Sequence, residues 1–460
     1  MRVKNGITNF SVPYEIAAVR PLRRTTLTER EEALKRAHYN TELIPQDVIY
    51  IDLKTDSGVS SLGIPQLGAM WGIDRLESGM EMAPEANMGF AALKQRFQEI
   101  FGFPFVVPCS LGRAAERIWI KIHVREGAVV AGNMLFPSTR FHIESSGAKV
   151  VDVSSEKAHD LFSDEPFKGN IDIEKLEKAI GEHGPDKMAC VYVELCVNSC
   201  GGHPVSMGCL KEVKSVLQPR AIPLFLDASR ILENSRLIQE REEGCQERSI
   251  AEIAREICSY ADGCTLSALK DFSVREGGLI GMRDGKSFQR AYFQSFFDGA
   301  QPSSPGLDSL GIVLGEIFRT DQYAAERVGE VQYLWQRLAE NGIPVLRPAG
   351  GHAVFIDVKS FLPHVPVERY PAEALAAFLY TSSGIRATKG PPLARSQTAR
   401  GTELMRLAVP ARRYLKGHLD DVAAAVMHTF AHRDEIKGLK KIEKPEPSKY
   451  DPALLAPVEA

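Results

Sequence analysis

The chain has 460 residues, of which 44% are hydrophobic and 25% charged, and its formal net charge is −3. A chain of this length and composition can bury a large core and is expected to form two or more domains. The near balance of charge argues against a nucleic-acid-binding surface, and no apolar run approaches the roughly 18 residues that a membrane span needs.

The cysteine pattern bears on metal binding and on the cellular compartment. The eight cysteines show neither a Cys-x-x-Cys pair nor a regular spacing, which argues against a zinc site or a disulfide framework. The amino-terminal segment lacks the apolar core of a secretory signal. We therefore expect a cytoplasmic protein with no nucleic-acid partner, no membrane partner and no metal.

Short apolar segments alternate with amphipathic ones from about residue 88 to residue 260. The predicted strands cover residues 105–108, 129–133, 148–153, 188–195 and 223–227. The predicted helices cover residues 88–102, 113–124, 171–180, 210–217 and 249–260. Asp172 is expected to cap one helix, and Phe90, Leu93, Phe97 and Phe101 to lie on one face of another. This alternation predicts an α/β fold with a mostly parallel sheet.

Composition changes near Pro302–Pro305, and a long helix is predicted at about residues 321–341, followed by a second, smaller α/β stretch. We expect an amino-terminal arm at residues 1–53, a large domain at 54–312 and a small carboxy-terminal domain at 313–460. The small domain could pack with part of the arm. The basic segment 438–449 is expected to be a solvated tail.

Two motifs suggest a site for pyridoxal 5'-phosphate (PLP). Ser267 and Lys270 follow a predicted strand in a Ser-x-x-Lys spacing, which lets the hydroxyl reach the cofactor phosphate while the amine reaches its aldehyde. That spacing alone is common by chance. About forty residues upstream, however, Asp227 ends an apolar strand and suits a protonated pyridine nitrogen. Together the motifs predict a PLP site.

Several segments, in order along the chain, resemble the tryptophanase and tyrosine phenol-lyase family. They include VAGNMLFPSTRFH (130–142), FKGNIDIEKL (167–176), VNSCGGHPVSM (197–207), FLDASRILENSR (225–236), ADGCTLSALKD (261–271) and AGGHAVFIDV (349–358). The similarity runs from about Asp52 to Leu439. It implies a PLP-dependent β-eliminating lyase of the aspartate-aminotransferase fold (fold type I), with a mostly parallel seven-stranded sheet and a smaller α/β domain. It also implies a homodimer or homotetramer.

The resemblance assigns the residues around the cofactor's aldehyde and phosphate. Lys270 falls where the family forms its Schiff base and removes the α-proton, so it is the expected catalytic residue. Ser267 matches the hydroxyl that meets the phosphate. Gly112 and Arg113 match the phosphate loop, where a helix amino terminus and a guanidinium suit a dianion.

The resemblance also assigns the residues around the ring and the substrate. Phe136 matches the aromatic side chain stacked on the cofactor, and Asp227 the partner of the pyridine nitrogen. Asn198 and Arg230 match the groups beside the phenolate oxygen, where a cation stabilises the anion. Arg406 matches the arginine that binds the α-carboxylate of the amino-acid substrate.

The residues that release the leaving group in the family mostly differ here. Pro84 stands where the family has the Tyr that protonates the departing carbon, and Met82 where a Glu helps to hold a monovalent cation. Leu269 replaces a Lys, Arg275 a cation-binding Asn, and Pro137 a Thr that contacts the ring hydroxyl. Because Pro has no proton to give, it cannot be a general acid.

The PLP residues are thus retained while the leaving-group residues are changed. We expect α-carbanion chemistry on an amino acid, most simply β-elimination or β-replacement on a substrate other than unmodified tyrosine or tryptophan. Amino transfer or another carbanion reaction is an alternative, and a protein that binds PLP without turnover is a second. Lys389 lies about where the family selects the substrate side chain, and a surface lysine is the competing interpretation there.

Overall fold

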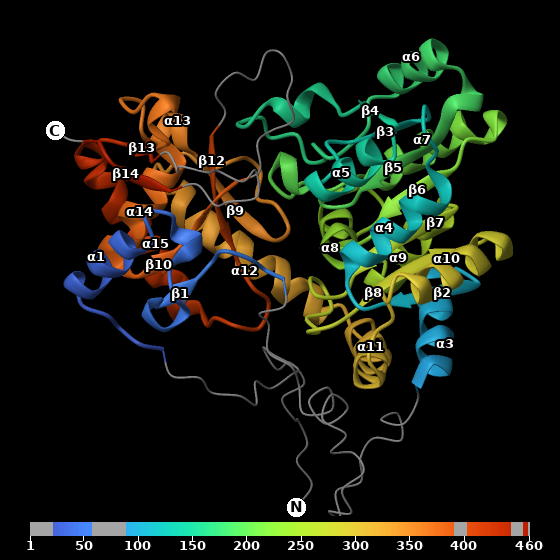
Figure 1. Cartoon of the computed structure of the whole chain (residues 1–460), viewed down its shortest axis with the longest axis horizontal. Helices are drawn as coiled ribbons and strands as arrows, with labels where there is room; N and C mark the ends of the chain where they lie inside the picture. Colours follow the sequence, from blue (N-terminus) through green and yellow to red (C-terminus); the bar gives the residue numbers. More distant parts are fainter. Residues whose placement is uncertain (1–21, 58–88, 391–402, 443–453, 459–460) are drawn as a thin grey trace, which may run out of the picture.

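The computed structural model describes residues 22–57, 89–390, 403–442 and 454–458. A seven-stranded sheet in the order β2-β8-β7-β6-β5-β3-β4 organises one lobe of the molecule (Figure 1). Its strands are β2 (Phe105–Cys109), β3 (Val129–Gly132), β4 (Lys149–Asp152), β5 (Met188–Glu194), β6 (Leu224–Asp227), β7 (Gly263–Ser267) and β8 (Gly278–Met282). Within this sheet β8 is antiparallel to both neighbours and the other pairs are parallel, so the prediction of a mostly parallel sheet is confirmed.

Helices cover both faces of the large sheet, and their apolar side chains form one core on each face. One core includes α4 (Gly112–His123), α5 (Pro137–Ser145) and α10 (Gly285–Phe297). The other includes α3 (Gly89–Phe101), α6 (Ile173–His183), α7 (Met207–Leu217), α8 (Ile231–Arg241), α9 (Ile250–Ser259) and α11 (Ser304–Ile317). Both faces of a parallel sheet are buried in this way, which is why its strands are apolar along their whole length.

Two local predictions can be compared with α6 and α3. Asp172 caps α6 as expected, since its carboxylate accepts a hydrogen bond of 3.0 Å from the Lys175 amide. All four aromatic and aliphatic residues expected on one face belong to α3, where Leu93, Phe97 and Phe101 are buried and Phe90, in the first turn, is 39% exposed.

The second lobe is built on a three-stranded sheet in the order β11-β12-β9 (Figure 1). Its strands are β9 (Ala353–Asp357), β11 (Thr388–Lys389) and β12 (Leu404–Ala408). Its helices are α12 (Gln322–Ala339), α13 (Val358–Phe361), α14 (Pro371–Ser383) and α15 (Lys416–Ala431). The position of α12 agrees with the predicted long helix.

Short 3-10 helices occur in both lobes. They are η1 (Thr41–Leu43), η2 (Gln46–Val48), η4 (Glu156–His159), η5 (Pro185–Lys187), η6 (Asn198–Cys200), η7 (Gln218–Arg220), η8 (Val367–Arg369) and η9 (Arg433–Glu435).

The amino-terminal segment lies within this second lobe. Its helix α1 (Leu27–Arg36) packs against α14, and its strand β1 (Ile51–Asp52) pairs in parallel with β10 (Ile385–Arg386). The predicted division at residues 312 and 313 falls inside α11, and we retain the three-part division of the chain as a proposal. In the part of the chain that the structure describes, no helix is both long and apolar enough to cross a bilayer.

The end of the chain contributes one more pair of strands. Leu439–Lys441 forms β13, which pairs antiparallel with β14 (Leu455–Pro457). The prediction that segment 438–449 is a solvated tail is therefore wrong for its first residues. The reason is that Leu439 is buried among the apolar side chains of the second lobe.

A glycine of β7 allows the close packing of the large sheet. A Cβ at Gly263 would lie 2.4 Å from a ring carbon of Phe225 and 2.7 Å from the carbonyl oxygen of Gly281. We therefore expect Gly263→Ala to lower the free energy of unfolding by about 1–3 kcal/mol, because added volume strains a packed core. Thermal and urea unfolding of the purified variant would measure it.

Gly181→Ala, in α6, is the matched control. A Cβ there meets nothing within 4 Å, so the change should be neutral or stabilising by up to about 1 kcal/mol. Equal shifts for the two variants would contradict the packing argument.

Candidate active site

A cavity of about 330 Å³ opens where the carboxyl ends of β6 and β7 meet the amino end of α4, the segment 55–57 and strand β12. Eight of the nine predicted site residues line its wall: Gly112, Arg113, Phe136, Asp227, Arg230, Ser267, Lys270 and Arg406. Segments that lie far apart in the sequence therefore meet at one place, and the carboxyl ends of parallel strands are where α/β folds bind ligands.

The amino end of α4 and the end of β7 form one end of the cavity. Gly112 is the first residue of α4, and a Cβ there would lie 2.4 Å from the Cβ of Ser267. Only glycine permits this approach of backbone to side chain. The Ser267 amide donates 2.9 Å to the Ser229 hydroxyl, and Arg113 lies exposed beside them. Helix amides, hydroxyls and a guanidinium in this arrangement can hold a phosphate dianion.

Lys270 lies in the turn that follows β7. Its amide donates 3.2 Å to the carbonyl oxygen of Ser267, which explains the Ser-x-x-Lys spacing as one tight turn. The amine Nζ lies 5.3 Å from the centre of the Phe136 ring. The amine and the ring thus both face the cavity, as a nucleophile and a flat apolar surface.

Two carboxyl groups also line the cavity. Asp227 is the last residue of β6 and is buried, and Glu116 approaches from α4. The Ser138 hydroxyl donates 2.8 Å to Glu116, and the Thr139 hydroxyl bonds its other oxygen. Burial raises the pKa of Glu116 to about 7. The sequence reasoning missed Glu116, although an acidic residue on an otherwise apolar face of a helix was a usable signal.

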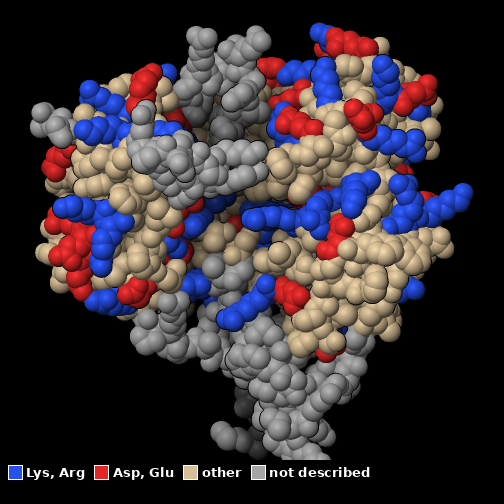
Figure 2. Space-filling view, viewed as in Figure 1, with Lys and Arg blue, Asp and Glu red and all other residues tan. Residues whose placement is uncertain are grey.

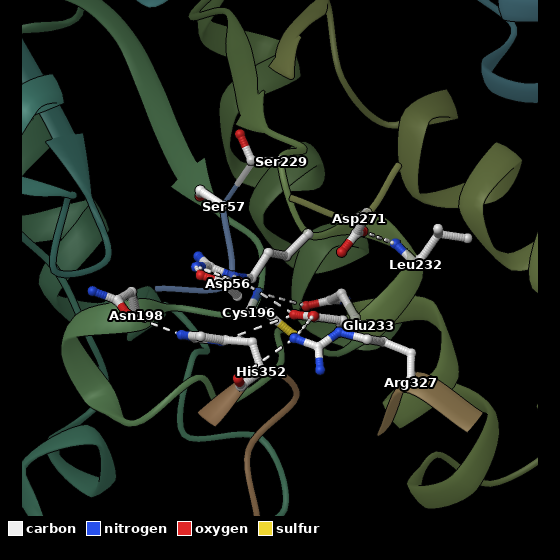
Figure 3. Close-up of polar contacts among 12 residues, drawn as sticks. Asp56, Ser57, Cys196, Asn198, Ser229, Leu232, Glu233, Asp271, Arg327 and His352 are labelled. Carbon is white, nitrogen blue, oxygen red and sulfur yellow. Dashed lines mark hydrogen bonds and ion pairs between the residues drawn. The ribbon is translucent and has the colours of Figure 1, made fainter. Parts of the chain in front are cut away.

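A buried network of charges begins at the cavity wall, which Asp56 helps to form (Figure 3). The Arg230 guanidinium donates hydrogen bonds to both carboxylate oxygens of Asp56, at 3.1–3.2 Å. Glu233 forms an ion pair with Arg327, with 3.0 Å between the nitrogen and the oxygen. Burial would raise the pKa of Asp56, but Arg230 in particular holds it well below its usual range. The network went unpredicted apart from Arg230, because its members lie on three separate parts of the chain.

His352 joins this network to Asn198. Burial lowers the pKa of His352 well below its usual value, so the imidazole is neutral. Its Nε2 donates 2.9 Å to Oδ1 of Asn198, because an amide oxygen can only accept. Asn198 is the one predicted site residue that does not line the cavity. Its Oδ1 also accepts a hydrogen bond from Arg406, which does line the cavity, so Asn198 orients a wall residue.

Arg406 enters the cavity from β12 in the second lobe. Its Nη1 donates 3.1 Å to Oδ1 of Asn198 and its Nη2 donates 3.0 Å to the carbonyl oxygen of Lys54. Its Nε is buried and has no partner among the residues described. A guanidinium that is oriented by two bonds and keeps a free N–H can bind a carboxylate.

Lys389 does not line the cavity. Its Nζ donates 2.8 Å to Glu403 and 3.4 Å to Glu373, on the outside of the second lobe. This agrees with the competing interpretation of a surface lysine and removes the suggestion that its ammonium faces the substrate.

The altered leaving-group residues are placed only in part. Leu269 lines the cavity beside Lys270, and Pro137 and Arg275 are exposed in the single chain. Met82 and Pro84 lie outside the described residues. Thr55 and Ser57, which the sequence analysis did not single out, also line the cavity.

Comparison with known proteins identifies the family to which the chain belongs. The model of the beta-eliminating lyase family matches residues 52–425 of the chain. The chain belongs to this family. A tyrosine phenol-lyase of Symbiobacterium thermophilum is 41% identical over 98% of the chain and 99% of its own length. A probable beta-eliminating lyase of Trichomonas vaginalis is 37% identical over 94% of the chain and 95% of its own length. The predicted resemblance is confirmed, and the chain is a lyase whose specific reaction remains open.

Solved structures of low sequence identity support the fold. The Sphingomonas wittichii serine palmitoyltransferase superposes with a TM-score of 0.64 at 15% identity, over 89% of this chain and 97% of its own. Bna3p of Saccharomyces cerevisiae, a putative kynurenine aminotransferase, gives a TM-score of 0.61 at 16% identity, over 88% and 96%. The predicted fold type I is therefore confirmed for this member of the beta-eliminating lyase family.

The buried network predicts a large effect of removing one charge. Arg327→Met leaves the Glu233 carboxylate buried with a weakened ion pair, since Arg230 lies 3.6 Å away from it. We expect a loss of about 3–5 kcal/mol in the free energy of unfolding, as for other broken buried pairs. Chemical denaturation followed by tryptophan fluorescence would measure it.

Arg140→Met is the matched control. Arg140 pairs with Glu144 on the surface of α5, and both side chains are exposed. Such a pair contributes about 0–1 kcal/mol, so this variant should unfold almost as the wild type does. A loss for Arg327→Met as small as that of the control would show that the network is not stabilising.

Proposed function

We propose that this beta-eliminating lyase binds PLP in the cavity and cleaves a β-substituent from an amino acid other than tyrosine or tryptophan. The observation that carries the proposal is the meeting of Lys270, Asp227 and the Gly112–Ser267 contact in one cavity, with Arg406 opposite them. These groups match, one by one, an amine for the aldehyde, a carboxylate for the pyridine nitrogen, a cradle for the phosphate and a guanidinium for the substrate.

The residues present fit the cofactor. The amino end of α4, Ser267 and Arg113 would hold the phosphate, and Phe136 would lie against the ring. The Asp227 carboxylate would accept a hydrogen bond from the protonated pyridine nitrogen and so keep the proton on the ring. When bound, PLP supplies an electron sink for the negative charge that develops at the substrate α-carbon. The steric argument at Gly112 supports this use, because a larger residue would fill the phosphate cradle.

The protein's own groups would orient the substrate and move its protons. Arg406, held by Asn198 and the Lys54 carbonyl, would bind the α-carboxylate. This fixes the amino acid with its α-hydrogen toward Lys270, whose Nζ takes that proton. The bond from Cβ to the leaving group then breaks, and the bonding electrons depart with that group. Positioning of this kind contributes much of an enzyme's rate enhancement.

The leaving group is the part of the substrate that the chain restricts. Phenol and indole leave only after a ring carbon is protonated, and Pro84 stands where the family's general acid is expected. A thiolate or a carboxylate departs as a stable anion and needs little or no protonation. S-substituted cysteines and O-acyl serines are therefore the substrates that we propose. Relatives such as the Symbiobacterium thermophilum protein are named tyrosine phenol-lyases, and we propose a different leaving group for this chain.

We further propose that the active form is a homodimer or homotetramer in the cytoplasm. The exposed face of α10 carries four large aromatic side chains, Tyr292, Phe293, Phe296 and Phe297, and Figure 2 shows a mostly uncharged area over this helix. Apolar area of this kind usually marks a protein–protein contact. The eight cysteines are all free and buried, which suits a reducing compartment.

Lys270 is expected to be the residue that joins the cofactor covalently. Lys270→Ala should abolish the visible absorbance band of the bound cofactor and all turnover, because no other lysine lines the described cavity wall. Borohydride reduction followed by peptide mapping should label Lys270. Lys389→Ala is the control and should keep both the band and the activity, and a label on any other lysine would refute the site.

The leaving group should determine which amino acids the enzyme cleaves fastest. The kcat/KM for S-methylcysteine should exceed the values for tyrosine and tryptophan, because a thiolate needs less help from an acid. Pyruvate, ammonia, keto acid and thiol should be assayed separately, since a keto acid that retains the side chain would indicate amino transfer instead. Faster turnover of either aromatic amino acid would contradict the argument from Pro84.

The exposed aromatic face of α10 is expected to hold the subunits together. Light scattering should give at least a dimer, and Phe293→Ser combined with Phe297→Ser should shift it toward the monomer by removing apolar area from the contact. A wild-type monomer with full activity would contradict the proposal that the active form is an oligomer.

A further inference from the structure

A second carboxyl group lies beside Asp227 at the ends of the central strands. Glu194 is the last residue of β5, and it is the register partner of Asp227 on the neighbouring parallel strand β6. Register partners project to the same face of a sheet, so the two carboxyl groups lie side by side. Both are buried, with 3% and 9% of their surface exposed. Two acids buried at this spacing would repel each other if both were ionised.

The contacts of Glu194 fix one of its oxygens and leave the other available. Oε1 accepts 2.8 Å from the Asn198 amide, and the Glu194 amide donates 2.8 Å to Oδ1 of Asn133. Oε2 is buried and has no partner among the described residues. A buried oxygen without a partner is costly when it is charged, and much less so when it carries a proton.

The surroundings of Glu194 decide which of the two acids holds that proton. Burial and the neighbouring Asp227 raise the pKa of Glu194 to about 8. The Asn198 amide and the cations Lys270 and Arg230 lower this pKa, but their combined effect is smaller. Glu194 is therefore protonated at neutral pH and ionises as the pH rises. Its charge can change within the range in which enzymes work, at a site next to the group expected to face the pyridine ring.

We propose that Glu194 is a second carboxyl group of the pyridine site, which governs how strongly the ring nitrogen of bound PLP holds its proton. The inference rests on the proposed function, because it requires the ring nitrogen to face Asp227. An ionised Glu194 adds a second negative charge there and favours the protonated ring at alkaline pH. Since the protonated ring is the better electron sink, the pair extends the pH range in which the cofactor can act. Glu194 acts through Asp227 and is a positioning residue.

A purely structural role is the competing explanation, in which Glu194 only fixes the turn at Asn198. Glu194→Gln separates the two roles. The amide oxygen can still accept the Asn198 hydrogen bond, but the side chain cannot ionise. Glu194→Asp keeps an ionisable group one methylene shorter, so it should restore part of the effect.

The experiment is a pH titration of ¹⁵N-labelled PLP bound to the whole enzyme, with the ring-nitrogen chemical shift as the readout. In Glu194→Gln the nitrogen should lose its proton about one to two pH units lower than in the wild type, as expected for one unit charge acting over about 6–10 Å at an effective dielectric constant near 20. Glu330→Gln is the control. Burial also raises the pKa of Glu330, to about 7, but this residue lies on α12 away from the cavity wall, so the nitrogen should titrate as in the wild type.

The outcomes separate this inference from the proposed function. Equal titration of wild type and Glu194→Gln, with PLP bound to both, would overturn the role of Glu194 alone. Failure of the wild type to bind PLP would overturn the proposed function. If Glu194→Gln does not fold, the same ¹⁵N titration of Glu194→Asp takes its place, because the shorter side chain moves the ionisable group relative to the ring. A ring nitrogen that loses its proton at a lower pH than in the wild type supports the inference, and an unchanged titration overturns it.

Discussion

Pairing of buried charges between separate parts of the chain is the constraint on which the cavity depends. Asp56 comes from the amino-terminal segment, Arg230 directly precedes α8, Glu233 lies in α8 and Arg327 in α12, and all four side chains are almost inaccessible. A charge can be buried at acceptable cost only when it is paired and hydrogen-bonded. Each segment therefore needs the others in place, and the two lobes are held together at the cavity wall.

The same constraint explains how the cavity is assembled from two lobes. The parallel sheet brings Asp227 and Ser267 to one edge, because the carboxyl ends of neighbouring strands meet there. Arg406 comes from the other lobe and is aligned by Asn198, whose oxygen also accepts from His352. The position of Arg406 relative to Asp227 and Ser267 is thus set by buried hydrogen bonds, and a small shift between the lobes would change it.

The sequence was most informative where the signal was local. The apolar strands, the Asp172 cap and the Ser267–Lys270 turn follow from neighbours within a few residues, and the structure has all of them. Family resemblance added long-range matches such as Arg406. Partners that meet only in the fold, such as Asp56 with Arg230, leave no local pattern and were missed. The two interpretations of Lys389 could not be separated from the sequence for the same reason, because its pairing with Glu403 depends on the fold.

The central claim is that the machinery for removing the α-proton is intact while release of an aromatic leaving group is not. The most direct test is to incubate the PLP-loaded enzyme in D₂O with tyrosine and, separately, with S-methylcysteine, and to follow both by proton NMR. We predict that the α-hydrogen of tyrosine exchanges with solvent without matching release of phenol, whereas S-methylcysteine yields pyruvate. Phenol formed as fast as the α-hydrogen exchanges, or no exchange with either amino acid, would contradict the claim.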